Sequence, residues 1–314
     1  LQLDANGEWF VRAGERKFEG AGRATGDLAT LAVVATARLP HGVAWQGNVH
    51  LVDGFSLDGR ATLERFDLAE VGAGTFAGPV SGALDVRGTL DAFTAKGRLD
   101  APQLRTGALD LALDGGYADR VFTVRSLAVA KPGTELRATA AGRVDLHESA
   151  HIRFTGDWNA LRWPFSGTPV VVLPRGRYSI EGAGTYAYTV DASVRGPSIP
   201  ASDVQARGDV DADRLRIAAL DARTLRGRVV GTGELGWRDE RPWSVKLEGR
   251  SLDFGVLRPR LAGRVNAAIE ANGRGFEPTG SWDARLRRLD GRVRGVAARG
   301  QGTAQMRSGQ LRVD

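Results

Sequence analysis

A spacing typical of zinc hydrolases occurs in the middle of the chain, at His147-Glu148-Ser149-Ala150-His151. Two histidines four residues apart bind one zinc ion, with the glutamate as general base, when all three lie on a helix. Here the flanking segments 144–146 and 152–154 alternate apolar and polar residues, as strands do. In an extended chain the two imidazoles diverge, and a third ligand would have to be a carboxylate such as Glu181. We therefore interpret the match as chance occurrence in a polar turn and expect no metal.

Other patterns associated with catalysis are incomplete. Segments 20–22 and 72–74 begin like a dinucleotide loop, but neither completes the Gly-x-Gly-x-x-Gly spacing inside a βαβ unit. The chain has no cysteine, which excludes disulfides, thiol catalysis and cysteine-based zinc sites. Carboxylate pairs such as Asp209 and Asp211 occupy alternating positions and fit the solvated face of a sheet. The sequence predicts neither an enzyme nor a cofactor.

The elements that hold these residues form a repeated pattern. A sequence pattern recurs about every 92 residues. It consists of an alternating segment that predicts a strand, then a glycine, then an aromatic residue that we call the aromatic anchor. It spans 151–161 and 244–254, and an earlier copy is visible at 62–68. The pattern predicts one elongated repeat domain over 1–314, with approximate units 1–58, 59–150, 151–243 and 244–314. In such proteins each repeat stacks on its neighbours, which gives an elongated structure rather than a globular domain with one active site.

The local signals favour β structure throughout. Segment 109–114 alternates strictly, Gly115-Gly116 predicts a turn, and 121–125 reads as the return strand. Segment 27–39 is compatible with a short capped helix, although its threonine and valine content favours strand. We expect a short helix or turn around each aromatic anchor, for example at 158–163. The predicted fold is all-β: an elongated, curled antiparallel or mixed sheet, a β-taco or trough with a hydrophobic groove.

Charge and composition limit the partners. The net charge is +6, and most of the positive charge is arginine that alternates with aspartate and apolar residues, as on a solvated sheet face. The densest basic stretch, 285–299, is the best candidate for contact with phosphate headgroups. The aromatics recur once per unit and fit a structural corner better than base stacking, so no nucleic-acid partner is expected.

The chain shows no targeting or anchoring segment. It opens on Leu1 without the charged and apolar regions of a signal peptide, and its longest apolar stretches are too short to cross a bilayer. We expect this sequence to be a piece of a longer protein whose membrane anchor lies elsewhere.

Several segments resemble a known family. They are 45–47, 61–68, 82–88, 98–102 and 261–265, and they are similar to the C-terminal repeat region of TamB, within the AsmA-like bridge lipid-transfer proteins. The resemblance implies a trough-shaped sheet with a hydrophobic interior. It also implies a periplasmic location in a diderm bacterium, an inner-membrane anchor and an outer-membrane barrel partner of the TamA type. The function implied is movement of phospholipid between the membranes in support of outer-membrane biogenesis.

The residues expected to line the groove are the apolar members of the alternating strands. They are Leu84, Val86, Leu109, Leu111, Leu113, Ile152, Phe154, Ile180, Val245, Leu247, Val265 and Ile269. The main alternative is a scaffold or chaperone for outer-membrane β-barrel proteins, which would pair their strands with an open sheet edge. A transmembrane barrel is disfavoured by four tyrosines and many outward arginines. A secreted β-solenoid would have a much shorter repeat.

Overall fold

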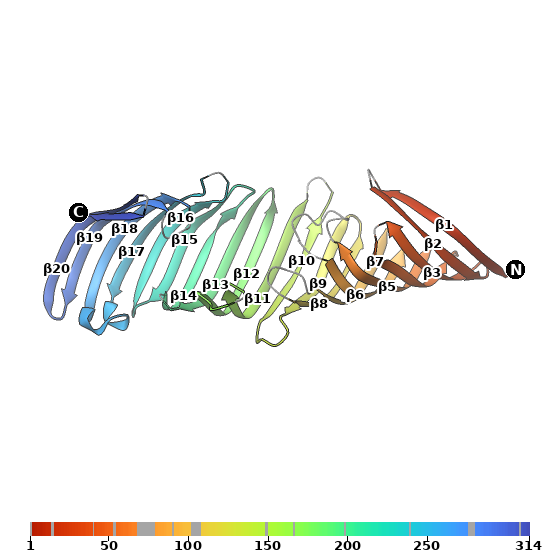
Figure 1. The fold of residues 1–314 in the computed structure, drawn as a ribbon, viewed down its shortest axis with the longest axis horizontal. Helices are drawn as coiled ribbons and strands as arrows, with labels where there is room; N and C mark the ends of the chain where they lie inside the picture. Colours follow the sequence, from red (N-terminus) through yellow and green to blue (C-terminus); the bar gives the residue numbers. More distant parts are fainter. Residues whose placement is uncertain are drawn as a thin grey trace. The chain divides into compact units, whose positions relative to one another are not determined.

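The computed structural model describes residues 2–13, 16–39, 41–52, 55–67, 79–89, 91–101, 108–147, 150–165, 167–197, 199–238, 240–275, 280–307 and 309–314. The chain divides into two compact units, Leu1–Ala150 and His151–Asp314. Each unit is an antiparallel sheet in which every strand pairs with the next strand along the chain (Figure 1).

The first unit contains the strands β1 to β10. Their bounds are β1 (Leu3–Ala13), β2 (Arg16–Gly26), β3 (Thr30–Leu39), β4 (Val43–His50), β5 (Ser56–Asp67), β6 (Pro79–Thr89), β7 (Ala92–Asp100), β8 (Asp110–Ala118), β9 (Val121–Ala130) and β10 (Arg137–Asp145). All of their pairings are antiparallel.

The second unit contains β11 to β21 and two short 3-10 turns. The strands are β11 (His151–Trp163), β12 (Val171–Ala183), β13 (Thr185–Gly196), β14 (Ile199–Val210), β15 (Arg214–Thr224), β16 (Gly227–Gly236), β17 (Pro242–Leu252), β18 (Gly263–Arg274), β19 (Ser281–Val293), β20 (Val296–Arg307) and β21 (Gln310–Val313). The turns η2 (Phe254–Val256) and η3 (Pro259–Leu261) join β17 to β18. The prediction of an all-β fold with curled antiparallel sheets is confirmed.

Alternation of residue type produces the strands. In β7 the exposed and half-buried positions alternate without interruption from Ala92 to Asp100, as expected for a sheet whose two faces differ. Segment 30–39 is strand β3, which confirms that interpretation, and Asp27 accepts the backbone N–H groups of Ala29 and Thr30 ahead of it. A periodicity of two therefore decides the structure even in the ambiguous segment.

Two local predictions are wrong. β8 continues through Gly115 and Gly116, and the chain reverses at Asp119 and Arg120, whose φ values are 48° and 59°. Two left-handed residues in succession form the tight reversal that matches strand twist, so glycine is not required there. The anchor 158–163 is not a helix or turn but the end of β11, because its residues pair with β12. At the anchor Phe254, by contrast, the expected short helix is present as the 3-10 turn η2.

The repeated sequence pattern coincides with a repeated backbone feature. Arg65, Ala160 and Ser251 each occupy the left-handed region, with φ of 51°, 53° and 53°. At Arg65 and Ser251 the register shifts as in a β-bulge, between Leu63 and Phe66 and between Gly249 and Leu252. A bulge adds one residue to one strand and bends it. In this way Leu63 and Phe66, three residues apart, contribute to one apolar cluster.

Little of the described chain is fully buried. The buried apolar residues fall mainly in two small clusters, one around Phe66, Val80 and Ala101 and the other around Leu225, Leu252 and Val265. The accessible surface is 20271 Å². A compact monomer of the same mass, 33.5 kDa, would expose roughly 12,700 Å² by the usual scaling. Each unit is therefore a single curled layer rather than two layers closed over a core.

Candidate functional site

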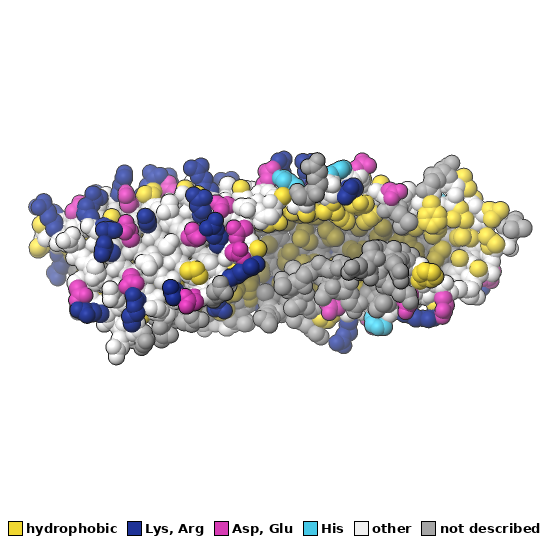
Figure 2. Space-filling view, turned by 90° about the horizontal axis from the view of Figure 1, so that it is seen from above, with side chains coloured by type: hydrophobic (Ala, Val, Ile, Leu, Met, Phe, Trp, Pro, Cys, Tyr) yellow, Lys and Arg dark blue, Asp and Glu magenta, His cyan; other side chains and the backbone are white. Residues whose placement is uncertain are grey.

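One face of the first unit is apolar from β3 to β10. Directly opposite residues of an antiparallel pair project from the same face, so the register shows which side chains adjoin. One such row contains only aliphatic residues, glycine and one tryptophan: Ala35, Trp45, Ala61, Leu84, Gly97, Leu113, Leu127 and Ala140. A parallel row is Val33, Gly47, Gly59, Val86, Ala95, Gly115 and Val124. Figure 2 shows hydrophobic side chains lining a hollow in this unit.

The same arrangement occurs in the second unit. One row is Phe154, Ile180, Tyr188, Gly208, Ile217, Gly233, Val245, Ala271, Ala284 and Ala304. The next row is Ile152, Gly182, Tyr186, Val210, Leu215, Leu235, Trp243, Gly273, Trp282 and Met306. Leu247 and Ile269 lie directly opposite each other in a third row. Each unit thus has an apolar face, which we define by these rows.

The structure places the expected lining residues differently along these faces. Leu84 and Leu113 share one row, and Val86 lies in the neighbouring one. Leu111 is directly opposite Leu99 and packs against the Phe66 cluster. Leu109 precedes β8 and is half-buried, and its carbonyl accepts the N–H of Ala101 at 2.9 Å.

In the second unit, one expected lining residue differs from the others. Ile152, Phe154, Ile180, Val245 and Leu247 are half-buried, and Ile269 is 38% exposed. All six side chains are therefore partly open to solvent. Val265 is only 3% exposed, because it packs with Leu225 and Leu252 beside η2. Val265 therefore belongs to a closed cluster at the end of the apolar face.

Tryptophan rings make the apolar faces smooth, a feature that the sequence analysis missed. Trp158 lies directly opposite Gly176, and a Cβ atom at Gly176 would be 2.1 Å from Cζ2 of the ring. The same pairing joins Trp9 to Gly20 and Trp243 to Gly273. Each ring thus occupies the space that a side chain on the facing strand would need. The only available signal was the strand register, since each glycine lies at a different sequence distance from its tryptophan.

The opposite face is charged, and its charges are paired. The Arg60 side chain donates to Asp85 at 2.8 Å, and this hydrogen bond holds the pKa of Asp85 below its ordinary value. Asp114 accepts from both Lys96 and Arg125, which likewise lower its pKa. Asp114 is half-buried and the other four groups are exposed, so these pairs give register and solubility rather than large stabilisation.

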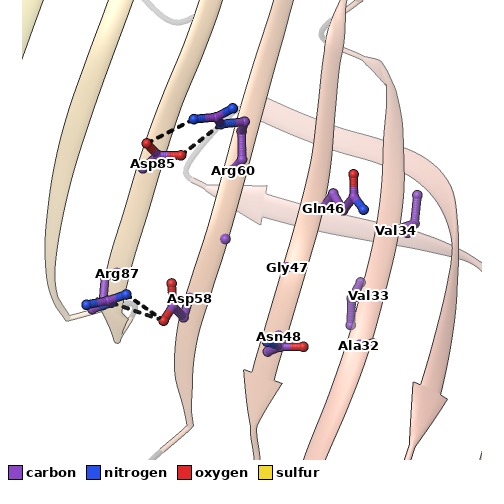
Figure 3. A pocket seen from close by; sticks show the side chains of 11 residues that line it. Ala32, Val33, Val34, Gln46, Gly47, Asn48, Asp58, Arg60, Asp85 and Arg87 are labelled. Atoms are coloured by element: carbon purple, nitrogen blue, oxygen red, sulfur yellow. Dashed lines mark hydrogen bonds and ion pairs between the residues drawn. The ribbon is translucent and has the colours of Figure 1, made fainter.

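This charged face also contains a polar hollow of about 650 Å³. Figure 3 shows it over β3 to β6, with Gln46 on one side and the Arg60–Asp85 and Arg87–Asp58 pairs on the other. The four charged groups neutralise one another, so the hollow presents no net charge to a ligand. We assign no site to it.

The zinc-like motif does not lie on a helix. His147 follows β10, and its backbone and imidazole both contact Oδ1 of Asp145, the imidazole Nδ1 at 2.7 Å. These hydrogen bonds lower the pKa of Asp145. His151 begins β11, and Glu148 lies outside the described residues. Within the described part of the chain, no group of three histidine or acidic side chains is placed to hold a metal ion.

The fold and the apolar face define a class of β-repeat protein built from curled antiparallel sheets. Residues 89–314 match the family model described as TamB, N-terminal domain, and the chain belongs to that family. The family is a periplasm-spanning transport and assembly module that associates with TamA, and it is not a family of enzymes. Comparison with curated proteins gave no match, and comparison with solved structures gave none either.

The family match corrects one detail of the sequence analysis. The resemblance pointed to the C-terminal repeat region, whereas the matching model is that of the N-terminal domain. Patterned glycines and aliphatic residues recur along such repeats, so they identify the family better than the position within it.

Among the described residues, no helix has the length and apolar character needed to cross a bilayer.

Proposed function

We propose that the apolar faces form a conduit for phospholipid between the inner and outer membranes, in support of outer-membrane biogenesis. The observation that supports this proposal is the absence of a second layer over the described apolar faces, although sheets normally bury such a face. Continuous apolar surface of this kind on a soluble protein indicates a ligand or partner.

An acyl chain has the right chemistry to cover these faces. Burying one methylene group contributes about 0.8 kcal/mol, so a sixteen-carbon tail gains on the order of 10 kcal/mol on leaving water. The headgroup stays in solvent. Because successive strands present similar aliphatic and glycine positions, as in the row through Leu84 and Leu113, the free energy of a tail changes little as it moves along. Movement without a deep binding site is what a conduit requires.

Nine of the twelve expected residues form the proposed wall on the two apolar faces: Leu84, Val86, Leu113, Ile152, Phe154, Ile180, Val245, Leu247 and Ile269. We give Leu111, Leu109 and Val265 a mainly structural role, because Leu111 and Val265 pack into clusters and Leu109 lies outside the strands. We further propose a periplasmic location in a diderm bacterium, an anchor outside this chain and a TamA-type barrel partner.

Photo-crosslinking at paired positions tests the proposal. A photoreactive amino acid is placed at Leu113 or Val245 on the apolar face, and at the adjacent outward residues Ala112 or Lys246 as matched controls. The expected result is capture of phospholipid from the inward positions and little from the outward ones. Equal capture from both faces, or none from the inward positions, contradicts the conduit. Capture of barrel-protein strands in place of phospholipid supports the scaffold alternative.

A further inference from the structure

One end of the strands in the second unit carries an unusual concentration of arginine. Segments 254–264 and 291–299 contain three arginines each and no aspartate, glutamate or lysine. They meet at the start of β18 and the end of β19, where the Arg294 N–H donates to the Ala262 carbonyl at 2.8 Å. We call Arg258, Arg260, Arg264, Arg292 and Arg294 the basic rim. All five side chains are exposed.

Within the basic rim, like charges face each other. Arg264 and Arg292 are direct partners across β18 and β19. Like charges directly opposite on an antiparallel pair destabilise it unless something neutralises them. Elsewhere the chain supplies a carboxylate: Arg228 and Arg250 are also direct partners, but Arg228 pairs with Asp221 and Arg250 with Glu248. No carboxylate of the described residues pairs with any member of the basic rim.

Two neighbouring acidic residues are already engaged. Asp290, two residues from Arg292, pairs with Arg288 at 3.1 Å and accepts from Nδ2 of Asn266 at 2.9 Å. Asp253 accepts the backbone N–H groups of Gly263 and Gly255 through Oδ1, at 3.2 and 2.9 Å, and Oδ2 pairs with Arg226 at 3.3 Å. These contacts hold the pKa of Asp253 below its ordinary value, so it stays ionised and fixed in place. It closes the turn rather than neutralising the basic rim.

The opposite strand end of the second unit, where β15 and β17 begin and β16 and β18 end, is neutralised. There Arg238 pairs with Asp213, Arg274 pairs with Glu240, and Arg214 pairs with Glu234 at 3.2 Å. Overall basicity therefore does not explain the basic rim, because arginines at the opposite strand end of the same unit have carboxylate partners. The difference between the two ends points to an external anion at the basic rim.

Apolar side chains lie beside the basic rim. Val256, Leu257 and Leu261 on the η2–η3 connection and Val296 at the start of β20 are all about half exposed or more. The connection is held to the sheet by Phe254, which packs against the cluster of Leu225, Leu252 and Val265. Figure 1 shows the connection beyond the ends of β17 and β18. Exposed aliphatic residues next to arginines are typical of protein surfaces that enter the headgroup layer of a membrane.

We propose that the basic rim and these apolar residues dock on the surface of a bilayer that contains anionic phospholipid. The guanidinium groups would bind lipid phosphates, and Leu257 and Leu261 would enter the interface below them. This site is separate from the proposed conduit, because the arginines lie at the strand ends and not on the apolar face. It would hold one end of the second unit at a membrane.

Vesicle binding tests the proposal with the 314-residue chain. The test variant carries Arg258→Gln, Arg264→Gln and Arg292→Gln, and the control carries Arg214→Gln, Arg238→Gln and Arg274→Gln, which removes the same charge at the other strand end. With phosphatidylcholine vesicles that contain phosphatidylglycerol, we expect the test variant to bind on the order of a hundredfold more weakly. The control should lose about threefold or less. Leu257→Ser with Leu261→Ser should weaken binding about tenfold and leave the salt dependence unchanged.

Three outcomes would overturn the proposal. The first is equal loss in the test and control variants, which would show that only net charge matters. The second is equal binding to vesicles of phosphatidylcholine alone. The third is full displacement of the chain by inorganic phosphate at the concentration of lipid phosphate, which would indicate a free anion rather than a membrane. Circular dichroism of both triple variants verifies that the strands are retained, and lipid crosslinking from Val245 reports separately on the conduit.

Discussion

The apolar face and the charged face of each sheet, called here the inner and the outer face, are built from the same strands. Successive residues alternate between the two faces, but the side chains on the two faces differ in whether they have partners. On the outer face, charges meet partners from the same chain, as Arg60 meets Asp85 and Lys96 meets Asp114. On the inner face, rows such as Phe154, Ile180 and Val245 meet only their neighbours in the sheet. Apart from the basic rim, many charges of the outer face are paired within the chain, whereas the described apolar side chains of the inner face have no second layer over them. This difference is the reason that we place the proposed conduit on the inner face.

The largest expected effect comes from a charge on the inner face. Val245→Arg places a guanidinium between Gly233 and Ala271, where no carboxylate is opposite. Because an acyl chain would have to share the wall with an unpaired charge, we expect at least tenfold less phospholipid to co-purify. Mass spectrometry of lipid extracts measures this effect. Ser244→Arg is the matched control, since it adds the same charge to the outer face opposite Glu234. Equal lipid loss in both variants would remove the distinction between the faces.

A second test concerns the smooth packing of the inner face. Gly176→Ala forces the Trp158 ring to move, because the new Cβ would lie 2.1 Å from it. We expect a loss of about 1–3 kcal/mol in unfolding free energy, as in other overpacked sites. Denaturant unfolding followed by tryptophan fluorescence measures it. Gly300→Ala is the control, with no atom within 4 Å of the new Cβ. If the two variants are equally stable, the tryptophan does not depend on the glycine.

The bulges give a smaller effect of opposite sign. Ser251 has φ of 53°, and a left-handed residue other than glycine costs roughly 1 kcal/mol. Ser251→Gly should therefore be neutral or slightly stabilising despite the entropy cost of glycine. Ser244→Gly, in the regular part of the same strand, should lose about 0.5–1 kcal/mol. Thermal unfolding of both variants compares them, and an equal loss would show that the bulge stores no strain.

The smallest effect belongs to the outer face. The pKa of Asp114 is lowered by Lys96 and Arg125, so its contribution to stability is present above the pKa of the unfolded carboxyl group. That contribution is lost as the pH falls through the lower pKa of the folded protein. Asp114→Asn should lower Tm slightly at neutral pH and not at all once the pH is below both values. A pH-independent change in Tm would mean that the pair acts through packing rather than charge.

The strands and their faces could be predicted from the sequence, because a period of two sets which residues share a face. This reasoning succeeded for β3, where threonine and valine outweighed a helix-like pattern. It failed at Gly115-Gly116, because the reversal uses Asp119 and Arg120 in left-handed conformations that no residue type announces. The Trp158–Gly176 contact depends on the register of two strands, which cannot be read from either strand alone.

The basic rim, too, could be predicted from the sequence only in part. The dense arginines of 285–299 were recognised as a candidate for phosphate contact. Their partners were not, since Arg287 pairs with Glu270 and Arg288 with Asp290, while Arg292 and Arg294 remain without carboxylates. Only the tertiary structure brings Arg258 and Arg264 to the strand end that carries Arg292 and Arg294.

Native mass spectrometry of the purified chain tests the central claim most directly. If the inner faces hold acyl chains, the protein should retain phospholipid in the gas phase, and Val245→Arg should release it while Ser244→Arg should not. A folded protein that carries no lipid, or one whose bound lipid is unaffected by Val245→Arg, would contradict this account of the inner face.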